Sequence, residues 1–154
     1  YLKLIRKIII SCPDWNVIVR LHHKMDYTVN QVTTHLKGLK YHLQGIDVNL
    51  QNALSKTSIV CGVHSSLLID GFFFKCVPIS INNLNFNLLE NANFERKKTG
   101  IVINSYDNAA KEIINLMSNK KRMNFYRNNI KKETRKIKRF ENLKKMVLKD
   151  IKNL

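Results

Sequence analysis

The stretch from Ser58 to Asp70, SIVCGVHSSLLID, constrains the fold of this chain more than any other part of the sequence. Ile59, Val60 and Val63 are apolar and β-branched, and the stretch contains no Asp, Glu, Lys or Arg before Asp70. A short run of this kind favours a central parallel strand that is covered on both faces. The stretch therefore predicts an α/β domain, in which such strands are buried between helices.

The residues after this strand predict a sharp turn into a helix. Gly62 lets the backbone turn tightly, and His64, Ser65 and Ser66 fall where a helix would begin. Serine is a preferred N-cap, and the free N–H groups of a helix start bind anions, phosphate above all. We interpret the turn as a phosphate-binding turn, with an ordinary strand-to-helix turn as the alternative, since any α/β unit uses Gly and Ser there.

The rest of the chain alternates between the apolar patterns of helices and those of strands. Helices are predicted over 1–12, 29–42, 49–56, 66–75, 108–117 and from 120 onward, and strands over 15–21, 41–48, 76–81 and 101–105. This alternation predicts a Rossmann-like open parallel sheet with helices on both faces and a long C-terminal helix. Pro78 predicts that strand 76–81 lies at an edge or that the proline sits at its start, because proline lacks the N–H that a sheet needs.

Polar residues at the end of strand 15–21 extend the candidate site. Ligands of open α/β sheets bind outside the carboxyl ends of the strands, so Arg20 and His22 should lie at the same edge as His64. Arg20 and His22 share side-chain parity, and both are predicted to face the crevice. Asp70, one helical turn past Ser66, is a candidate acceptor for a sugar hydroxyl. The alternatives are a structural ion pair for Arg20 and a solvated carboxylate for Asp70.

Charge divides the chain into two parts. The net charge is +16, and residues 119–154 carry fourteen Lys or Arg and three Asp or Glu. We expect a domain over 1–118 and, over 119–154, a basic amphipathic helix that packs on this domain or on a missing N-terminal domain. Contact with an anionic membrane surface is a second reading of this helix. No nucleic-acid-binding motif accompanies the charge, so specific nucleic-acid binding is not expected.

Other chemistries find little support in the sequence. The dinucleotide and P-loop motifs and HExxH are absent. His22, His23 and Asp26 lack a convincing further ligand, so neither a metal nor a cofactor is expected. Three cysteines without zinc spacing or an even disulfide set indicate a reducing compartment, with Cys61 and Cys76 as buried free thiols. No apolar run approaches the roughly 18 residues that span a bilayer.

Four segments together resemble the C-terminal half of GT-B glycosyltransferases, especially the bacterial capsule, polysialyltransferase and teichoic-acid polymerase-like enzymes. They read VIVRLHH over 17–23, LSKTSI over 54–59, GVHSS over 62–66 and VPI over 77–79. His22 matches the histidine of the family's His-Pro motif, with His23 in place of the proline. Ser65 and Ser66 match its Ser-Ser motif, and Asp70 stands where an acidic residue often contacts the donor. The resemblance covers about residues 1–118.

The resemblance implies a donor-binding domain that takes a nucleotide-activated sugar as substrate. His22 and His64 would be catalytic, Arg20, Gly62, Ser65 and Ser66 would bind the donor phosphates, and a glycan or glycolipid would be the acceptor. The general base of such enzymes lies on the N-terminal domain, so this chain alone is expected to be inactive. It also implies polysaccharide biosynthesis in the cytoplasm, with peripheral contact to the inner face of the membrane. The alternatives are a sugar-nucleotide epimerase-like domain of the same architecture and a non-enzymatic basic adaptor that binds anionic membrane or nucleic acid.

Overall fold

The computed structural model describes residues 1–21, 27–45, 47–62, 66–81 and 94–152, with side chains of the last helix described as far as Lys138. Its elements are α1 (Leu2–Ser11), β1 (Ile18–Arg20), α2 (Val29–His35), β2 (His42–Gln44), α3 (Leu50–Ser55), β3 (Ile59–Gly62), α4 (Leu67–Phe73), β4 (Val77–Ile81), β5 (Ile101–Ile103), α6 (Tyr106–Ser118) and α7 (Lys120–Lys152). Strands and helices alternate along the chain as predicted. The α/β class is therefore confirmed.

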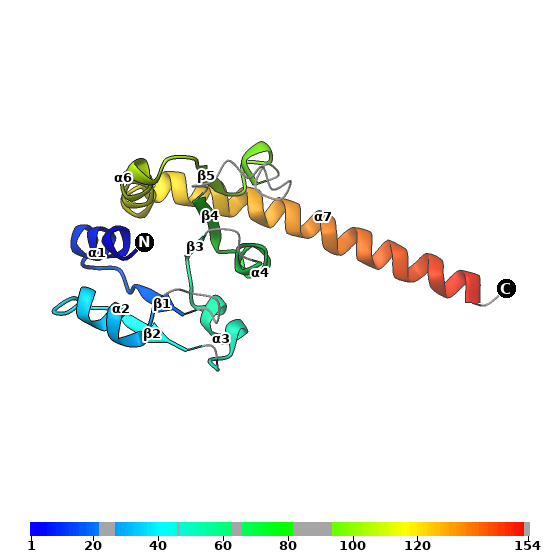
Figure 1. The fold of residues 1–154 in the computed structure, drawn as a ribbon. Helices are drawn as coiled ribbons and strands as arrows, with labels where there is room; N and C mark the ends of the chain where they lie inside the picture. The colour runs from blue at the N-terminus through cyan, green and yellow to red at the C-terminus, as the bar shows by residue number, and fades with distance from the viewer. Residues whose placement is uncertain (22–26, 46, 63–65, 82–93, 153–154) are drawn as a thin grey trace.

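The strands form two parallel groups. β1 pairs with β2, and β3, β4 and β5 pair in that order. In Figure 1 the strands follow one another from top to bottom as β5, β4, β3, β1, β2, with α1, α2 and α6 on the left and α3 and α4 on the right. Helices thus cover both faces, as in a Rossmann-like open sheet. Among the described residues, however, no ladder joins β1 to β3, so the sheet is divided at that point.

Strand β3 is an edge strand of its three-stranded ladder, not the central strand that the sequence predicts. Among the described residues it pairs with β4 alone, and of its four residues Val60 is the buried one. The central strand of the three is β4, all five residues of which are buried. Cys76 is buried as predicted, but Cys61 is exposed.

Pro78 lies in the central strand, near its start. Pro78 is the second residue of β4, and the pairing with β5 begins one residue later, where Ile79 lies opposite Ile101. The missing N–H of the proline therefore costs the sheet little, and the alternative edge position is wrong. Gly100 makes this arrangement fit, because a Cβ there would lie 2.7 Å from the Pro78 carbonyl oxygen and 2.8 Å from its ring Cγ.

Helix α1 connects two hydrophobic cores. Leu4 belongs to the larger core, which surrounds β3, β4 and β5, while Leu2 and Ile9 belong to the smaller core with Val19 of β1. The apolar residues of α1 recur at three- and four-residue spacing, so two sides of the same helix are available for packing. α1 therefore holds the two strand groups together.

The first half of the basic helix α7 packs on the chain's own sheet. Met123 and Ile130 are buried in the larger core. Arg127 donates to the Ser58 hydroxyl over 2.9 Å, and the Asn129 side-chain amide donates to the Lys98 carbonyl over 3.0 Å. Because Ser58 immediately precedes β3, α7 crosses the amino edge of the strands. Figure 1 shows the second half projecting away from the body of the molecule.

Candidate functional site

The candidate site lies at the carboxyl edge of the strands. Four of the predicted site residues belong to the described part of the chain: Arg20, Gly62, Ser66 and Asp70. His22, His64 and Ser65 lie outside the described residues, as do His23 and Asp26. The chain positions of His22 and His64 put them on the connections that leave β1 and β3.

Strand β3 and helix α4 flank the predicted turn, whose residues 63–65 lie outside the described part of the chain. β3 ends at Gly62, and Ser66 is the N-cap residue of α4. The Ser66 carbonyl accepts the N–H groups of Ile69 and Asp70 over 2.9 and 3.0 Å. The Ser66 side chain is exposed and makes no capping hydrogen bond. The predicted helix start is confirmed, and its hydroxyl is not used to close the helix.

Helix α4 lies unusually close to strand β3. A Cβ at Gly71 would lie 2.9 Å from Val60 Cγ2, nearer than side chains pack. Glycine is needed here for close approach, since its conformation is helical. Gly71 therefore lets α4 settle on the β3–β4 surface, which positions the start of the helix beside the end of the strand.

Ser80 is a further candidate residue, which the sequence reasoning did not single out. It lies in β4 directly opposite Gly62, is 1% exposed, and its hydroxyl has no hydrogen-bond partner within the described structure. A buried hydroxyl without a partner costs about 1–3 kcal/mol, which makes it a strong candidate to receive one from a ligand or water. The signal in the sequence was a lone serine inside the apolar run VPISI.

Arg20 and Asp70 differ in how they are held. The Arg20 guanidinium is half-buried and donates to the Val48 carbonyl over 3.0 Å, which ties the end of β1 to the connection between β2 and α3. Asp70 lies in the first turn of α4 and is partly exposed. A carboxylate there is stabilised by the helix dipole and stays available to a ligand hydroxyl.

Tyrosines gather at the same edge. The rings of Tyr1 and Tyr106 meet edge-on with centroids 5.8 Å apart, and the Tyr106 hydroxyl is buried with no partner in the described structure. Burial, followed by the proximity of Tyr106 and Cys61, raises the pKa of the Tyr1 phenol. Burial, followed by the proximity of Tyr27, raises the pKa of Tyr106. Residues from the starts of α1 and α6, from β3 and from the segment before α2 thus converge here.

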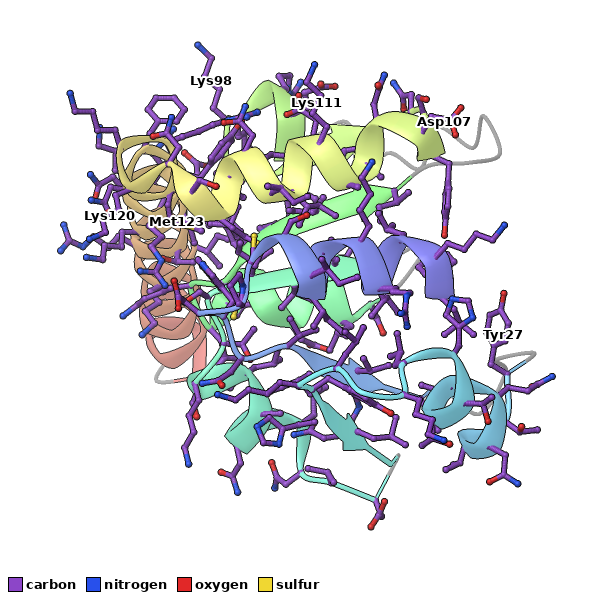
Figure 2. The ribbon with its side chains drawn as sticks, turned by 90° about the vertical axis from the view of Figure 1, so that its left-hand side faces the viewer. Tyr27, Lys98, Asp107, Lys111, Lys120 and Met123 are labelled. Atoms are coloured by element: carbon purple, nitrogen blue, oxygen red, sulfur yellow. The ribbon has the colours of Figure 1, made fainter. Side chains whose placement is uncertain are left out.

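The basic helix is on the other side of the molecule. Figure 2 shows Tyr27 and Asp107 at the right and Lys120 and Met123 of α7 at the left. The exposed cations of the described part of α7 are Lys120, Lys121, Lys131, Lys132, Arg135, Lys136 and Lys138. The candidate site and the basic surface therefore occupy opposite edges of the sheet.

A groove of about 530 Å³ is lined by β5 and by residues of α6 and of the first turns of α7. Its wall includes an ion pair in which Arg122 Nη2 lies 2.9 Å from Glu112 Oε2. No predicted site residue lines the groove. We therefore assign it no part in the candidate site.

Two further observations concern the described residues alone. They contain no group of three or more His, Cys, Asp or Glu side chains arranged to hold a metal ion. Among them there is also no helix that combines the length and the apolar character needed to cross a bilayer.

Comparison with known proteins returned no relative: no protein-family model, no curated protein and no solved structure matches this chain.

Proposed function

We propose that this chain is the donor-binding half of a glycosyltransferase that transfers a sugar from a nucleotide-activated donor to a surface-polysaccharide or glycolipid acceptor. One observation carries the proposal. The uncommitted Ser66 hydroxyl at the start of α4 and the buried, unpartnered Ser80 hydroxyl both belong to elements that adjoin the bare backbone of Gly62. The sequence resemblance to GT-B enzymes supplies the substrate class.

In this proposal the donor diphosphate sits against the β3–α4 connection. Its oxygens accept hydrogen bonds from the hydroxyls of Ser65, Ser66 and Ser80, and the positive end of the α4 dipole favours their negative charge. Negative charge grows on the departing nucleotide phosphate as the glycosidic bond breaks, and donors aimed at it lower the barrier. We assign His22 and His64 to this role as cations, since imidazolium groups donate from both nitrogens.

The remaining groups fix the orientation of the donor. Asp70 accepts from a hydroxyl of the ribose or the sugar. Arg20 supports the opposite wall through the Val48 carbonyl, so it acts by positioning as well as by charge. The acceptor and the general base belong to the other half of the enzyme. The cellular setting that follows is the cytoplasm.

A thermal-shift experiment tests the proposal. The intact chain is heated with CMP, UDP, CDP or GDP. A nucleotide at a hundredfold excess over its Kd should raise Tm by about 5–10 °C in a domain of this size. Ser66→Ala and Ser80→Ala should abolish the shift, and Ser118→Ala, an exposed serine on α6 that bonds to Ile114, should retain it. Absence of a shift with all four nucleotides contradicts donor binding.

The basic surface of α7 favours a second candidate, an adaptor that binds anionic membrane. Deleting α7 would not test it, since Met123 and Ile130 belong to the core. Replacing the exposed Lys131, Lys132 and Arg135 by Gln preserves that core. Loss of co-sedimentation with vesicles containing anionic lipid, with nucleotide binding intact, would support membrane binding. Unchanged co-sedimentation would contradict it, and equal binding to single-stranded DNA would indicate a general polyanion surface instead.

A further inference from the structure

The division between β1 and β3 is a place where the sheet is incomplete. Within the described part of the chain, β3 pairs on one side, with β4, and β1 pairs on one side, with β2. These two strands are nevertheless neighbours in the stack of five that Figure 1 shows. The facing edges of β1 and β3, which form no ladder among the described residues, therefore lie in the middle of the domain and not at its rim.

Backbone groups of both strands point into this division. The Val77 N–H donates to the Ser58 carbonyl over 2.9 Å, and Ile59 lies opposite Val77. The alternation of a parallel ladder then turns the N–H and C=O groups of Ile59 and Cys61 away from β4. On the other side, His42 donates to the Val17 carbonyl over 2.9 Å, which turns the backbone of Ile18 away from β2.

The side chains beside the division are apolar and yet reach solvent. Ile18 is 39% exposed and Cys61 is exposed, whereas the alternate residues Val19 and Val60 are buried. The sequence of β3 is that of a strand with neighbours on both sides, which is why it was predicted to be central. An added strand would satisfy the exposed backbone and cover these side chains at once.

Helix α1 has the position and direction of a crossover helix over the division. Its start lies at the carboxyl edge, where Tyr1 meets Tyr106, and its end leads through Cys12 to β1. It packs on both cores, with Leu4 on one and Leu2 and Ile9 on the other. In a right-handed β-α-β unit, a helix placed in this way connects two parallel strands that lie side by side.

We propose that one additional parallel strand, continuous with the start of α1, lies in the division between β1 and β3. The strand enters at the amino edge, pairs with both β1 and β3, and ends next to Tyr1. Its chemistry follows from its surroundings: about four residues, apolar and β-branched, with no charge and no proline. Its carboxyl end then forms part of the floor of the candidate site.

Amide hydrogen exchange on the full chain tests this proposal. A segment Val-Ile-Val-Ile is joined through Asn-Gly to Tyr1, and a matched control carries Pro-Ile-Pro-Ile, which lacks two donors. The first segment should slow exchange at Ile18, Ile59 and Cys61 together by at least about tenfold, and the control should leave it fast. Val19 and Val60, which face their present partners, should be protected in every form.

Four results would overturn the proposal. The first is that exchange does not slow at all, and the second is that only one of the two strands is protected. The third is that the free Val-Ile-Val-Ile peptide added in trans protects both strands as well as the joined segment does, which would refute continuity with α1. The fourth is that the three amides are already as protected as Val19 and Val60 in the unextended chain. In that case, protection that depends on protein concentration would indicate pairing with a second copy of the chain. Protection that does not depend on concentration would indicate direct pairing of β1 with β3.

Discussion

Removing the Ser80 hydroxyl should stabilise the protein and weaken its binding of ligand. Ser80 is 1% exposed in the central strand, and its hydroxyl has no partner in the described structure. Burying an unpaired hydroxyl costs about 1–3 kcal/mol, while the single oxygen that Ser80→Ala removes leaves little empty space. We expect Ser80→Ala to raise the free energy of unfolding by about 1 kcal/mol.

Thr99 provides a matched control for this effect. It is also 1% exposed, but its hydroxyl donates to the Phe94 carbonyl over 3.4 Å. Thr99→Val keeps the shape and removes the bond, so it should lower the free energy of unfolding by about 1 kcal/mol. Opposite signs for two buried hydroxyls would show that hydrogen-bond satisfaction, and not burial, sets the sign.

The assay is urea denaturation followed by circular dichroism, with and without the nucleotide that gives the largest thermal shift. The free protein should gain stability in Ser80→Ala, and the nucleotide-dependent gain should fall. A loss of stability in the free protein would mean that the Ser80 hydroxyl already has a partner, and the reasoning would be refuted. A gain in stability with undiminished nucleotide binding would remove Ser80 from the site and leave the account of its burial intact.

Further substitutions test the packing and one ion pair. Ile130 is fully buried on α7, so Ile130→Ala should lower the free energy of unfolding in urea by about 2–5 kcal/mol. Phe125 is 48% exposed on the same helix, so Phe125→Ala should lower it little. Equal effects would contradict the packing of α7 on the sheet. Gly100→Ala should lower Tm by several degrees, because its Cβ would meet Pro78, and an unchanged Tm would refute that contact. Hydrogen bonds from Lys136 and then Lys97 lower the pKa of Glu133. The stability that Glu133 contributes is therefore present above the ordinary pKa of the carboxyl and is lost as pH falls through its lowered pKa in the folded protein. Glu133→Gln should flatten the acid limb of the plot of Tm against pH. An unaltered acid limb would contradict the pairing of Glu133 with the two lysines.

Much of the architecture could be predicted because it depends on local patterns. The alternation of helices and strands followed from periodicity. The helix predicted over 29–42 is shorter, because it ends at His35, ahead of Gly38 with its φ of +79°. The helix start at Ser66 followed from capping preference. Apolar periodicity does not show how many strands pair with a given strand. It therefore identified β3 as suited to the centre of a sheet but did not show that β4 is the central strand of its three-stranded ladder.

The candidate site could be predicted only in outline. The helix start at Ser66 was predicted correctly from its residue type, whereas Gly62 is the last residue of β3 and its part in a binding site stays a prediction. Ser80 was not singled out because a lone serine in the apolar run VPISI does not show whether its hydroxyl has a partner, which depends on the surrounding structure. The bond from Arg20 to Val48 joins residues 28 apart, which no spacing rule anticipates.

The sequence by itself determined the class of the fold, the strand-turn-helix at Ser58–Asp70 and the basic amphipathic character of the last helix. These follow from the side-chain order and backbone preferences of neighbouring residues. Only the tertiary structure decided that α7 packs at the edge opposite the candidate site and that β1 and β3 lie unjoined. Those features depend on contacts between distant segments, where packing and the demand of each backbone N–H and C=O for a partner decide the arrangement.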